Sequence, residues 1–596
     1  MYIATMTSQK KPLDAWVRAL TRTAGVEKDT HRTFPVVIEE LARSRGVAPA
    51  LEAPGGGLTY AGLAGRTRQY SRWALAQGLV PGDVVGLLMP NRPEYLAIWL
   101  GLTRVGVIVA LLNTNLRGEP LHHSVSIVGP KHVIVDASLA GAIDEIRPAL
   151  PESARLWVHG VTRAGFVDLA AELVRLSDEP LDERAVPLPS IRDRALYIYT
   201  SGTTGLPKAA NVSHGRVMQW SHWFAGMMDT QPEDRMYNCL PLYHSVGGII
   251  ATAATLVGGG AVVLRDKFSA SDFWRDVVAE RCTLFQYIGE LCRYLVNAPP
   301  HPLETKHRLR LCCGNGLRPD VWQPFKTRFK IPHILEFYAA TEGNFSLYNC
   351  EEEPGAIGRI PPFLSHRLPV EIVRFDFDAE VPLRNDAGRC ERAGADEPGE
   401  AIGRIVEGSA GGRFEGYADS EASRNKVLLD VFDAGDRWYR TGDLMRRDAR
   451  GFFHFVDRAG DTFRWKGENV SSAEVAGALM ACPGVRDAVV YGVAVPGVDG
   501  RAGMAAIVVD QSFDLGGLRE RLAASLPEYA RPLFLRMLPG IEVTATFKPK
   551  KQELVRDGFD PARIDDPIFF DDRKRAAYIP VEASLYARLA AGALRL

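Results

Sequence analysis

Residues 197–208 read YIYTSGTTGLPK, an apolar run that breaks into a loop of small hydroxyl residues and glycines. The β-branched and aromatic residues from Leu196 to Tyr199 predict a buried strand. The loop after it offers hydroxyl donors and lets backbone N–H groups turn inward without a Cβ in the way, through Thr200, Ser201, Gly202, Thr203, Thr204 and Gly205. Lys208 adds a positive charge at the far end. The stretch therefore predicts a loop that holds a polyphosphate.

Two other interpretations of this loop fit less well. A Walker A loop requires Gly-x-x-x-x-Gly-Lys-[Ser/Thr], whereas Lys208 follows Pro207 and precedes Ala209. An ordinary turn before a helix explains most short windows of such residues, but it explains the full string poorly.

The rest of the chain alternates short apolar strands with helices, which predicts parallel, helix-covered sheets. A first α/β layer has expected strands at residues 83–89, 108–112, 132–135 and 156–159. A second layer follows the loop, with an expected helix at 212–227 and strands at 235–240, 284–287, 309–313 and 334–338. From about residue 355 to 455 the chain changes to short strands with Gly- and Pro-rich turns, which predicts a small β-rich unit. The remainder predicts a compact α+β piece, and residues 1–34 a loosely packed extension.

Composition narrows the class of protein. The 596 residues are too many for one core, so roughly two to five domain-sized units are expected. The net charge is -1, which provides no overall field for nucleic acid. The eight cysteines have no metal-ligand spacing, and a reducing compartment fits them best. The N-terminus lacks the apolar segment of a signal peptide.

One uncharged run, residues 245–264, is long enough to cross a bilayer. Its five glycines instead favour a buried helix, a turn and then a strand at 261–264. We expect a cytoplasmic protein that contacts a membrane peripherally; the basic residues for such contact would be Arg531, Arg536, Lys548, Lys550, Lys551 and Arg556, although a solvated face explains them equally well.

Four further stretches combine residue types that suit nucleotide chemistry: EFYAATEGN (336–344), YRTGD (439–443), DRAGDTFRWKGENV (457–470) and TATFK (544–548). An acidic oxygen that holds a hard cation would offset the repulsion between a polyphosphate and a carboxylate nucleophile. A carboxylate can also accept two hydrogen bonds from a vicinal diol. Each stretch alone is weak evidence, because a capped loop, a plain turn or a solvated basic patch would explain it.

Together, and in this order, the five stretches resemble the adenylate-forming superfamily of acyl-CoA synthetases, luciferases and peptide-synthetase adenylation domains. The resemblance implies that residues 200–205 and Lys208 hold phosphates and that Tyr338 stacks on adenine beside Gly314, Asn315 and Gly316. It implies that Thr341 contacts the α-phosphate and that Thr203 and Glu342 bind Mg²⁺. Asp443 and Arg458 would reach the ribose.

The remaining roles follow from the same resemblance. His244 matches the stretch that lines the acyl site near the carboxylate, Lys548 the adenylation lysine, and Lys466 and Gly467 the loop that approaches the pantetheine of coenzyme A. Two positions depart from the wider pattern. The usual hinge position is Gly460, and Thr-Phe replaces Ser-Gly before Lys548, so Lys550 and Lys551 are alternative assignments.

Several segments resemble the fatty acid transport protein and very-long-chain acyl-CoA synthetase branch over residues 55–580, among them YIGELCRYL (287–295) and CGNGLRPDVW (313–322). The resemblance implies an α/β multidomain fold: an N-terminal adenylation domain (1–457) with two α/β subdomains and a β-barrel-like subdomain, a hinge (458–461) and a small mobile C-terminal domain (462–596). It also implies a ligase that joins a long or very long fatty acid to CoA with ATP and Mg²⁺.

Two alternatives remain open. A fatty acyl-AMP ligase would deliver the acyl group to a carrier protein, and such enzymes usually carry an insertion that is not evident between Gly343 and Arg404. A membrane fatty-acid carrier would not need Lys548. The sequence leaves the preferred chain length and the oligomeric state undetermined.

Overall fold

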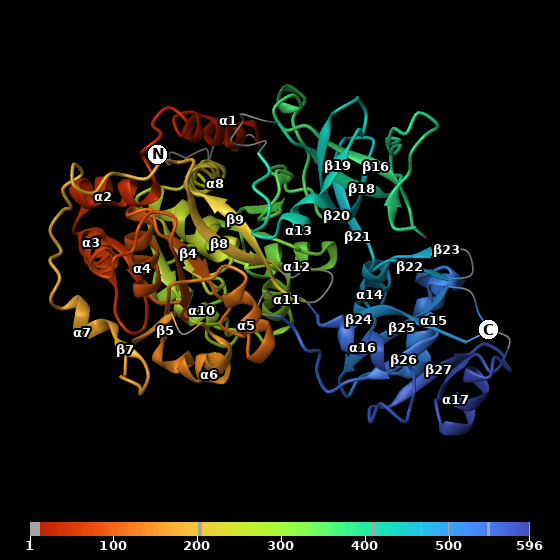
Figure 1. Ribbon diagram of the computed structural model, residues 1–596. Helices are drawn as coiled ribbons and strands as arrows, with labels where there is room; N and C mark the ends of the chain where they lie inside the picture. The colour runs from red at the N-terminus through yellow and green to blue at the C-terminus, as the bar shows by residue number, and fades with distance from the viewer. Residues whose placement is uncertain are drawn as a thin grey trace, which may run out of the picture. The chain divides into compact units, whose positions relative to one another are not determined.

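The computed structural model describes residues 12–151, 153–200, 206–377, 379–406, 413–465, 468–496, 498, 500–544 and 549–594 (Figure 1). By internal contacts the chain forms two compact units. Unit 1 comprises residues 1–368 and 404–427, and unit 2 comprises residues 369–403 and 428–596. The β-rich segment expected near 355–455 thus contributes strands to unit 2. The hinge at 458–461 stays a prediction.

The described residues of unit 1 form two sheets whose inner strands are parallel, as the alternation of strands and helices predicts. The first has the order β7 (Val167–Asp168), β6 (Arg155–His159), β5 (His132–Asp136), β3 (Val84–Leu88), β4 (Ile108–Leu111), β8 (Arg194–Thr200), β9 (Lys208–Ser213). The second has the order β15 (Ser346–Asn349), β14 (Ile334–Ala339), β13 (Leu311–Asn315), β12 (Leu284–Ile288), β10 (Arg235–Asn238), β11 (Ala261–Leu264), β1 (Pro49–Glu52), β2 (Leu58–Thr59).

Helices connect these strands and cover them. In unit 1 they include α2 (Phe34–Arg45), α3 (Tyr60–Ala76), α4 (Pro93–Arg104), α5 (Gly118–Ser126), α6 (Ala140–Ile146), α8 (His214–Met227), α10 (Phe273–Ala279), α11 (Gly289–Asn297) and α12 (Pro319–Arg328). The inner strands are buried along nearly their whole length, for example β4 and β5. Burial on both faces is why they appear in the sequence as continuous apolar runs.

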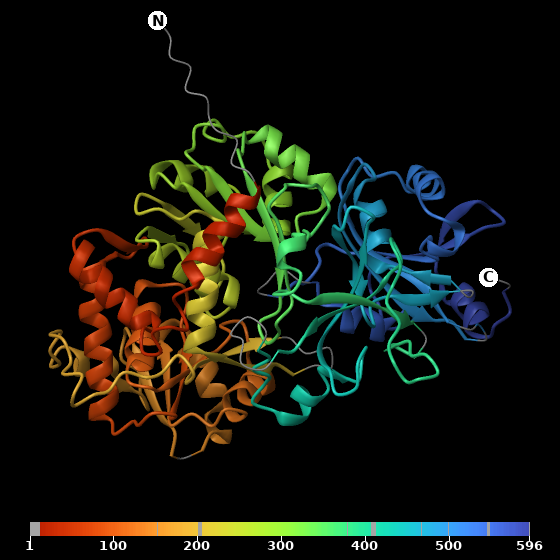
Figure 2. The ribbon, with the colours of Figure 1, turned by 90° about the horizontal axis from the view of Figure 1, so that it is seen from above.

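Two local expectations need correction. The N-terminal region is not simply a loose extension, because α1 (Pro12–Thr23) packs along α8 and buries Trp16 and Ala19 (Figure 2). The helix expected at 212–227 begins only at His214. The residues before it form β9, which pairs antiparallel with β8, so the predicted phosphate loop connects two paired strands. Ala209, Ala210 and Val212 are buried there, which favours a strand.

The uncharged run at 245–264 folds as a buried helix, a turn and β11, as expected. The helix is π-helical over Val246–Ala253 before α9 (Ala254–Val257). This region is tightly packed, since a Cβ on Gly247 would collide with the carbonyl oxygen of Pro241. Among the described residues, no helix combines the length and the apolar character needed to cross a membrane.

The described residues of unit 2 form three sheets. One contains β17 (Val381–Pro382), β16 (Val370–Asp376), β18 (Gly399–Arg404), β20 (Arg437–Arg447), β19 (Val427–Leu429) and β21 (Phe453–Arg458). The second pairs β22 (Phe463–Trp465) with β23 (Glu468–Val470). The third has the order β24 (Val485–Ala494), β25 (Arg501–Val509), β26 (Phe534–Met537), β27 (Ile568–Asp572), β28 (Ala577–Pro580). The helices of unit 2 include α14 (Ser472–Met480), α15 (Leu515–Ser525), α16 (Lys551–Asp557) and α17 (Ala583–Ala590).

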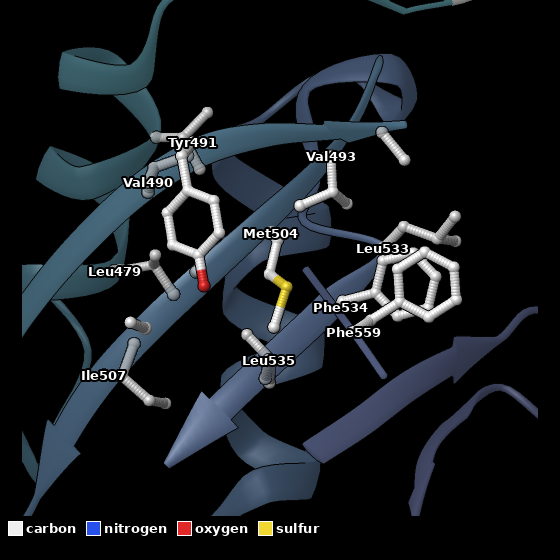
Figure 3. Packing of buried hydrophobic residues seen from close by; sticks show 14 of the residues in the cluster. Leu479, Val490, Tyr491, Val493, Met504, Ile507, Leu533, Phe534, Leu535 and Phe559 are labelled. Carbon is white, nitrogen blue, oxygen red and sulfur yellow. The ribbon is translucent and has the colours of Figure 1, made fainter. Parts of the chain in front are cut away.

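The third sheet and its helices share one hydrophobic core (Figure 3). Met504 and Leu535, from adjacent strands, lie at its centre. Phe534 stacks on Phe559 with ring centroids 4.2 Å apart. Unit 2 therefore has a core of its own, which a separately folded unit requires.

We predict that Gly226→Ala detaches α1 from α8. The new Cβ would lie 2.6 Å from the backbone nitrogen of Ala19, and overpacking of this kind costs about 1–3 kcal/mol. Gly141→Ala, on α6, is the matched control, because its new Cβ would have no atom within 4 Å. Urea unfolding and limited proteolysis of the N-terminus measure both effects; equal stability of the two variants would contradict the packing of α1.

Candidate active site

The predicted phosphate loop is framed by two paired strands. Thr200 ends β8 and Lys208 begins β9, and the two residues are partners in the register of the hairpin. Ser201, Gly202, Thr203, Thr204 and Gly205 lie outside the described residues. The Lys208 ammonium lies 5.9 Å from the centroid of the Tyr417 ring. The ends of the loop are thus fixed by sheet hydrogen bonds.

A second segment of unit 1, residues 413–418, runs along β9. The Asn211 N–H donates to the Gly416 carbonyl (2.9 Å), and the Asn211 side-chain amide donates to the carbonyls of Glu415 (2.9 Å) and Tyr417 (3.0 Å). The Ala418 N–H donates to the Ala209 carbonyl (2.8 Å). These bonds set the position of Tyr417 beside β9, the strand that follows the predicted phosphate loop.

Tyr417 in turn contacts the predicted metal ligand. Its hydroxyl donates to Glu342 Oε1 over 2.7 Å, and both side chains are buried. Burial, and then the neighbouring Glu342 carboxylate, raise the pKa of Tyr417, so the hydroxyl stays a donor at all physiological pH values. Sequence reasoning missed Tyr417. Glu342 is thereby held in one orientation by a residue from a distant segment.

Thr341, the neighbour of Glu342, is held from two sides. Its hydroxyl lies 3.1 Å from the Ser245 hydroxyl, next to His244. Its carbonyl accepts a hydrogen bond from the Arg216 guanidinium (2.9 Å), which also donates to the Arg413 carbonyl (2.5 Å). The structure therefore brings the predicted residues His244, Thr341 and Glu342 into one neighbourhood of unit 1.

Arg216 is a buried charge on α8 with its carboxylate partner nearby. Its Nε lies 3.7 Å from Glu415 Oε1, and the two side chains are only 4% and 10% exposed. Glu415 also accepts from the backbone N–H (2.8 Å) and the hydroxyl (2.6 Å) of Ser213. Sequence reasoning missed Arg216, although a lone arginine in a mostly apolar helix is a signal of a buried pair.

The predicted adenine residues lie at adjacent strand ends. Gly314 and Asn315 end β13, and Gly316 follows in the left-handed region with φ of 79°. The neighbouring strand β14 carries Tyr338, which is partly exposed and packs edge-on against Phe345 with centroids 5.5 Å apart. The carboxyl ends of parallel strands are the usual place for a ligand in such sheets.

The two predicted ribose residues meet in unit 2. Asp443 on β20 and Arg458 on β21 are partners across the strand pair, and Asp443 Oδ1 lies 3.6 Å from Arg458 Nε. The preceding Arg440 forms a two-pronged ion pair with the fully buried Glu400 (2.6–3.1 Å), which also accepts from the Gly442 N–H (3.2 Å). Sequence reasoning missed Glu400, a charge inside the short apolar run of β18.

Residues near the predicted hinge and lysine also pair within unit 2. Lys551 donates to Asp461 (3.0 Å) and to the Ser472 hydroxyl (3.1 Å), while Lys550 donates to Glu542 (3.1 Å). Gly460 has a φ of 88°, a conformation that favours glycine. Lys548, Lys466 and Gly467 lie outside the described residues.

The described residues hold no group of three or more His, Cys, Asp and Glu side chains suited to a metal. A single carboxylate such as Glu342 nevertheless fits Mg²⁺, which proteins often bind through one or two carboxylates together with substrate phosphates.

Comparison with known proteins places the chain in a class. Residues 38–396 match the family model described as AMP-binding enzyme, and residues 474–548 match the AMP-binding enzyme C-terminal domain. The structure resembles an anthranilate CoA ligase in complex with anthranoyl-AMP, with a TM-score of 0.76, 20% identity, and coverage of 88% of this chain and 97% of that one. The chain belongs to the AMP-binding enzyme family, the adenylate-forming superfamily that its motifs predict.

Its closer relatives define the branch. The chain is 41% identical to long-chain fatty acid transport protein 1 of Mus musculus over 573 residues, which cover 94% of this chain and 88% of the mouse protein. It is 42% identical to long-chain fatty acid transport protein 6 of Mus musculus, over 86% of this chain and 83% of that protein. Within the superfamily it lies in the fatty acid transport protein and very-long-chain acyl-CoA synthetase branch, which confirms the resemblance seen in the sequence.

We predict that Arg216→Met destabilises unit 1 by about 3 kcal/mol, because it leaves the buried Glu415 without its cation. The matched control is Arg163→Met, whose partly exposed guanidinium pairs with Asp144 (2.7 Å) on the surface and should hardly affect stability. Urea unfolding measures both variants. An Arg216 variant as stable as the Arg163 variant would contradict a structural role for this buried charge.

Proposed function

We propose that this protein is a long-chain or very-long-chain fatty acid–CoA ligase that forms acyl-CoA from fatty acid, ATP and CoA through an acyl-adenylate, releasing AMP and pyrophosphate. The observation that carries the proposal is the buried Thr341–Glu342 site beside the phosphate-loop hairpin, in a chain 41% identical along 94% of its length to a protein named for long-chain fatty acids.

In the first step the fatty carboxylate attacks the α-phosphorus, the bond to the β-phosphate oxygen breaks, and pyrophosphate leaves. Thr341 contacts the α-phosphate, and the hairpin loop with Lys208 holds the leaving phosphates. Glu342 and Thr203 would hold Mg²⁺, whose charge would offset the repulsion between two anionic reactants. The Tyr417 hydroxyl keeps Glu342 oriented for this task. Lys548 stabilises the charge that develops between carboxylate and phosphate.

In the second step the CoA thiol attacks the acyl carbon of the mixed anhydride, and AMP leaves. Rotation at Gly460 withdraws Lys548 and brings Lys466 and Gly467 to the acyl group. Lys550 and Lys551 are each paired with a carboxylate of unit 2, which supports Lys548 as the adenylation lysine.

We further propose that the protein works at the cytoplasmic side of a membrane, where its substrate resides. The basic residues considered for this contact give limited support. Arg536 pairs with Asp557 (3.1 Å) and Asp566 (2.8 Å), and Arg531 donates to the Leu526 carbonyl (3.0 Å). Their charges are largely engaged inside unit 2.

ATP–pyrophosphate exchange with acids of increasing chain length, with and without CoA, tests the function. Exchange should require a long acid, and acyl-CoA should accumulate only when CoA is present. Exchange without any acyl-CoA product, but with transfer to a phosphopantetheinyl carrier protein, would instead identify a fatty acyl-AMP ligase.

Lys548→Ala separates the two half-reactions. We expect a loss of exchange of about 100-fold or more, because a transition-state charge contact is removed, while thioester formation from supplied acyl-adenylate stays within about threefold of wild type. Lys550→Ala is the matched control and should retain exchange. Equal loss of both half-reactions in the Lys548 variant would refute its role, and fatty-acid uptake unaffected by Lys548→Ala would favour a carrier.

A further inference from the structure

A buried carboxyl lies on the same strand as Tyr338 and opposite Gly314, two of the predicted adenine residues. Glu336 is on β14, two residues before Tyr338, and is only 5% exposed. It interrupts an otherwise apolar run, Ile334–Phe337, on a strand that lies between β13 and the edge strand β15. A buried carboxyl is costly unless its oxygens are hydrogen-bonded, so its contacts show what keeps it there.

The contacts of Glu336 come from β12, two strands away in the sheet, and from the end of the adjacent strand β13. The Tyr287 hydroxyl, on β12, donates to Glu336 Oε2 over 2.5 Å. The Leu317 N–H, just after β13, donates to Glu336 Oε1 over 3.1 Å. Tyr287, Gly314 and Glu336 are partners in the register of the three strands. One side chain therefore ties together the carboxyl ends of β12, β13 and β14.

The backbone between these contacts has little room to move. A Cβ on Gly314 would lie 2.4 Å from the Tyr287 ring, and a Cβ on Gly289, at the start of α11, would collide with the Gly316 carbonyl. The segment Gly314–Gly316 is thus packed against Tyr287 and α11. The hydrogen bond from the next residue, Leu317, to Glu336 restrains the end of the segment. Its position depends on the same carboxyl that precedes Tyr338.

The surroundings of Glu336 contain neutral groups. The titratable side chains that face it are Tyr287, Cys292 on α11 and Cys313 on β13. Burial raises the pKa of each of these three groups, so they are uncharged at neutral pH. Burial also raises the pKa of Glu336 to about 8, against the opposing effect of its hydrogen bonds to Tyr287, Leu317 and Gly316. A protonated carboxyl suits such a site.

We propose that Glu336 is a positioning residue for the adenine end of the nucleotide site, which fixes the Gly314–Gly316 segment relative to the strand that carries Tyr338. It acts through Tyr287 and Leu317 and does not touch the reacting atoms. This inference rests on the proposed function, because it assigns a purpose to the adenine site of that reaction.

Steady-state kinetics of three variants test the proposal. Glu336→Leu removes both hydrogen bonds, and the KM for ATP should rise about tenfold or more, while kcat and the KM for the fatty acid stay within about threefold. Glu336→Gln should stay within about threefold of wild type, because its oxygen can accept from Leu317 and its amide N–H can point to the Tyr287 oxygen. Tyr287→Phe should raise the KM for ATP about three- to tenfold.

Asp571→Asn is the matched control for loss of a buried carboxyl. Asp571, on β27 in unit 2, pairs with Arg519 (2.7 Å), so its variant should lose thermal stability with an unchanged KM for ATP. A folded Glu336→Leu variant with an unchanged KM for ATP would overturn the proposal. Where that variant does not fold, an unchanged KM for ATP in Tyr287→Phe overturns it instead.

The pH dependence of stability supplies a second readout. A carboxyl whose pKa is higher in the folded chain than in the unfolded chain loses its stabilising effect as the pH rises. The melting temperature of wild type relative to Glu336→Gln should therefore fall between about pH 5 and pH 8. A difference that does not change with pH would contradict the buried protonated carboxyl and with it the contacts on which the proposal depends.

These outcomes are separable from failure of the proposed function. Wild-type protein that shows no ATP–pyrophosphate exchange with any acid refutes the function. Active wild-type protein, together with a Glu336→Leu variant that binds AMP by calorimetry as tightly as wild type, refutes only the role of Glu336.

Discussion

A buried guanidinium organises the part of unit 1 that contains Thr341 and Glu342. Arg216, from α8, donates to the carbonyls of Thr341 and Arg413 and lies beside Glu415. Because a buried charge must be paired and hydrogen-bonded, its partners are fixed to one another. They come from segments that lie far apart in the sequence, and the residue that orients Glu342, Tyr417, lies on one of them. The geometry of the Thr341–Glu342 pair thus depends on tertiary contacts rather than on its own loop.

The same logic recurs at the two other places where nucleotide residues are expected. Glu400 holds Arg440 and the Gly442 N–H next to Asp443, and Glu336 holds Tyr287 and Leu317 next to the Gly314–Gly316 segment. In each case a buried polar side chain fixes the backbone beside a residue that would contact ATP. Such preorganisation lets binding groups act without a reorganisation cost during the reaction.

The sequence predicted the features that depend on local pattern. Strands buried on both faces are continuous apolar runs, so the parallel sheets were predictable. The adenylate-forming family was predictable from the five motif stretches and their order. Arg216, Tyr417 and Glu400 were not, because their roles exist only once distant segments meet. β9 was missed because the residues after the predicted phosphate loop were interpreted as leading into a helix. α1 was missed because its buried face is narrow and consists of Trp16, Ala19 and Thr23. Charges inside apolar runs were the overlooked signal. The roles of all the site residues remain predictions from the motifs, and Thr203, Lys466, Gly467 and Lys548 also lie outside the described residues.

The central claim is that the scattered motifs hold one acyl-adenylate. The most direct test is a crystal structure of the protein with a non-hydrolysable acyl-sulfamoyl-adenosine. The account predicts adenine stacked on Tyr338 beside Gly314–Gly316, with both ribose hydroxyls bonded to Asp443 and the sulfamoyl group next to Thr341. Adenine bound elsewhere, or a ribose without contact to Asp443, would contradict it.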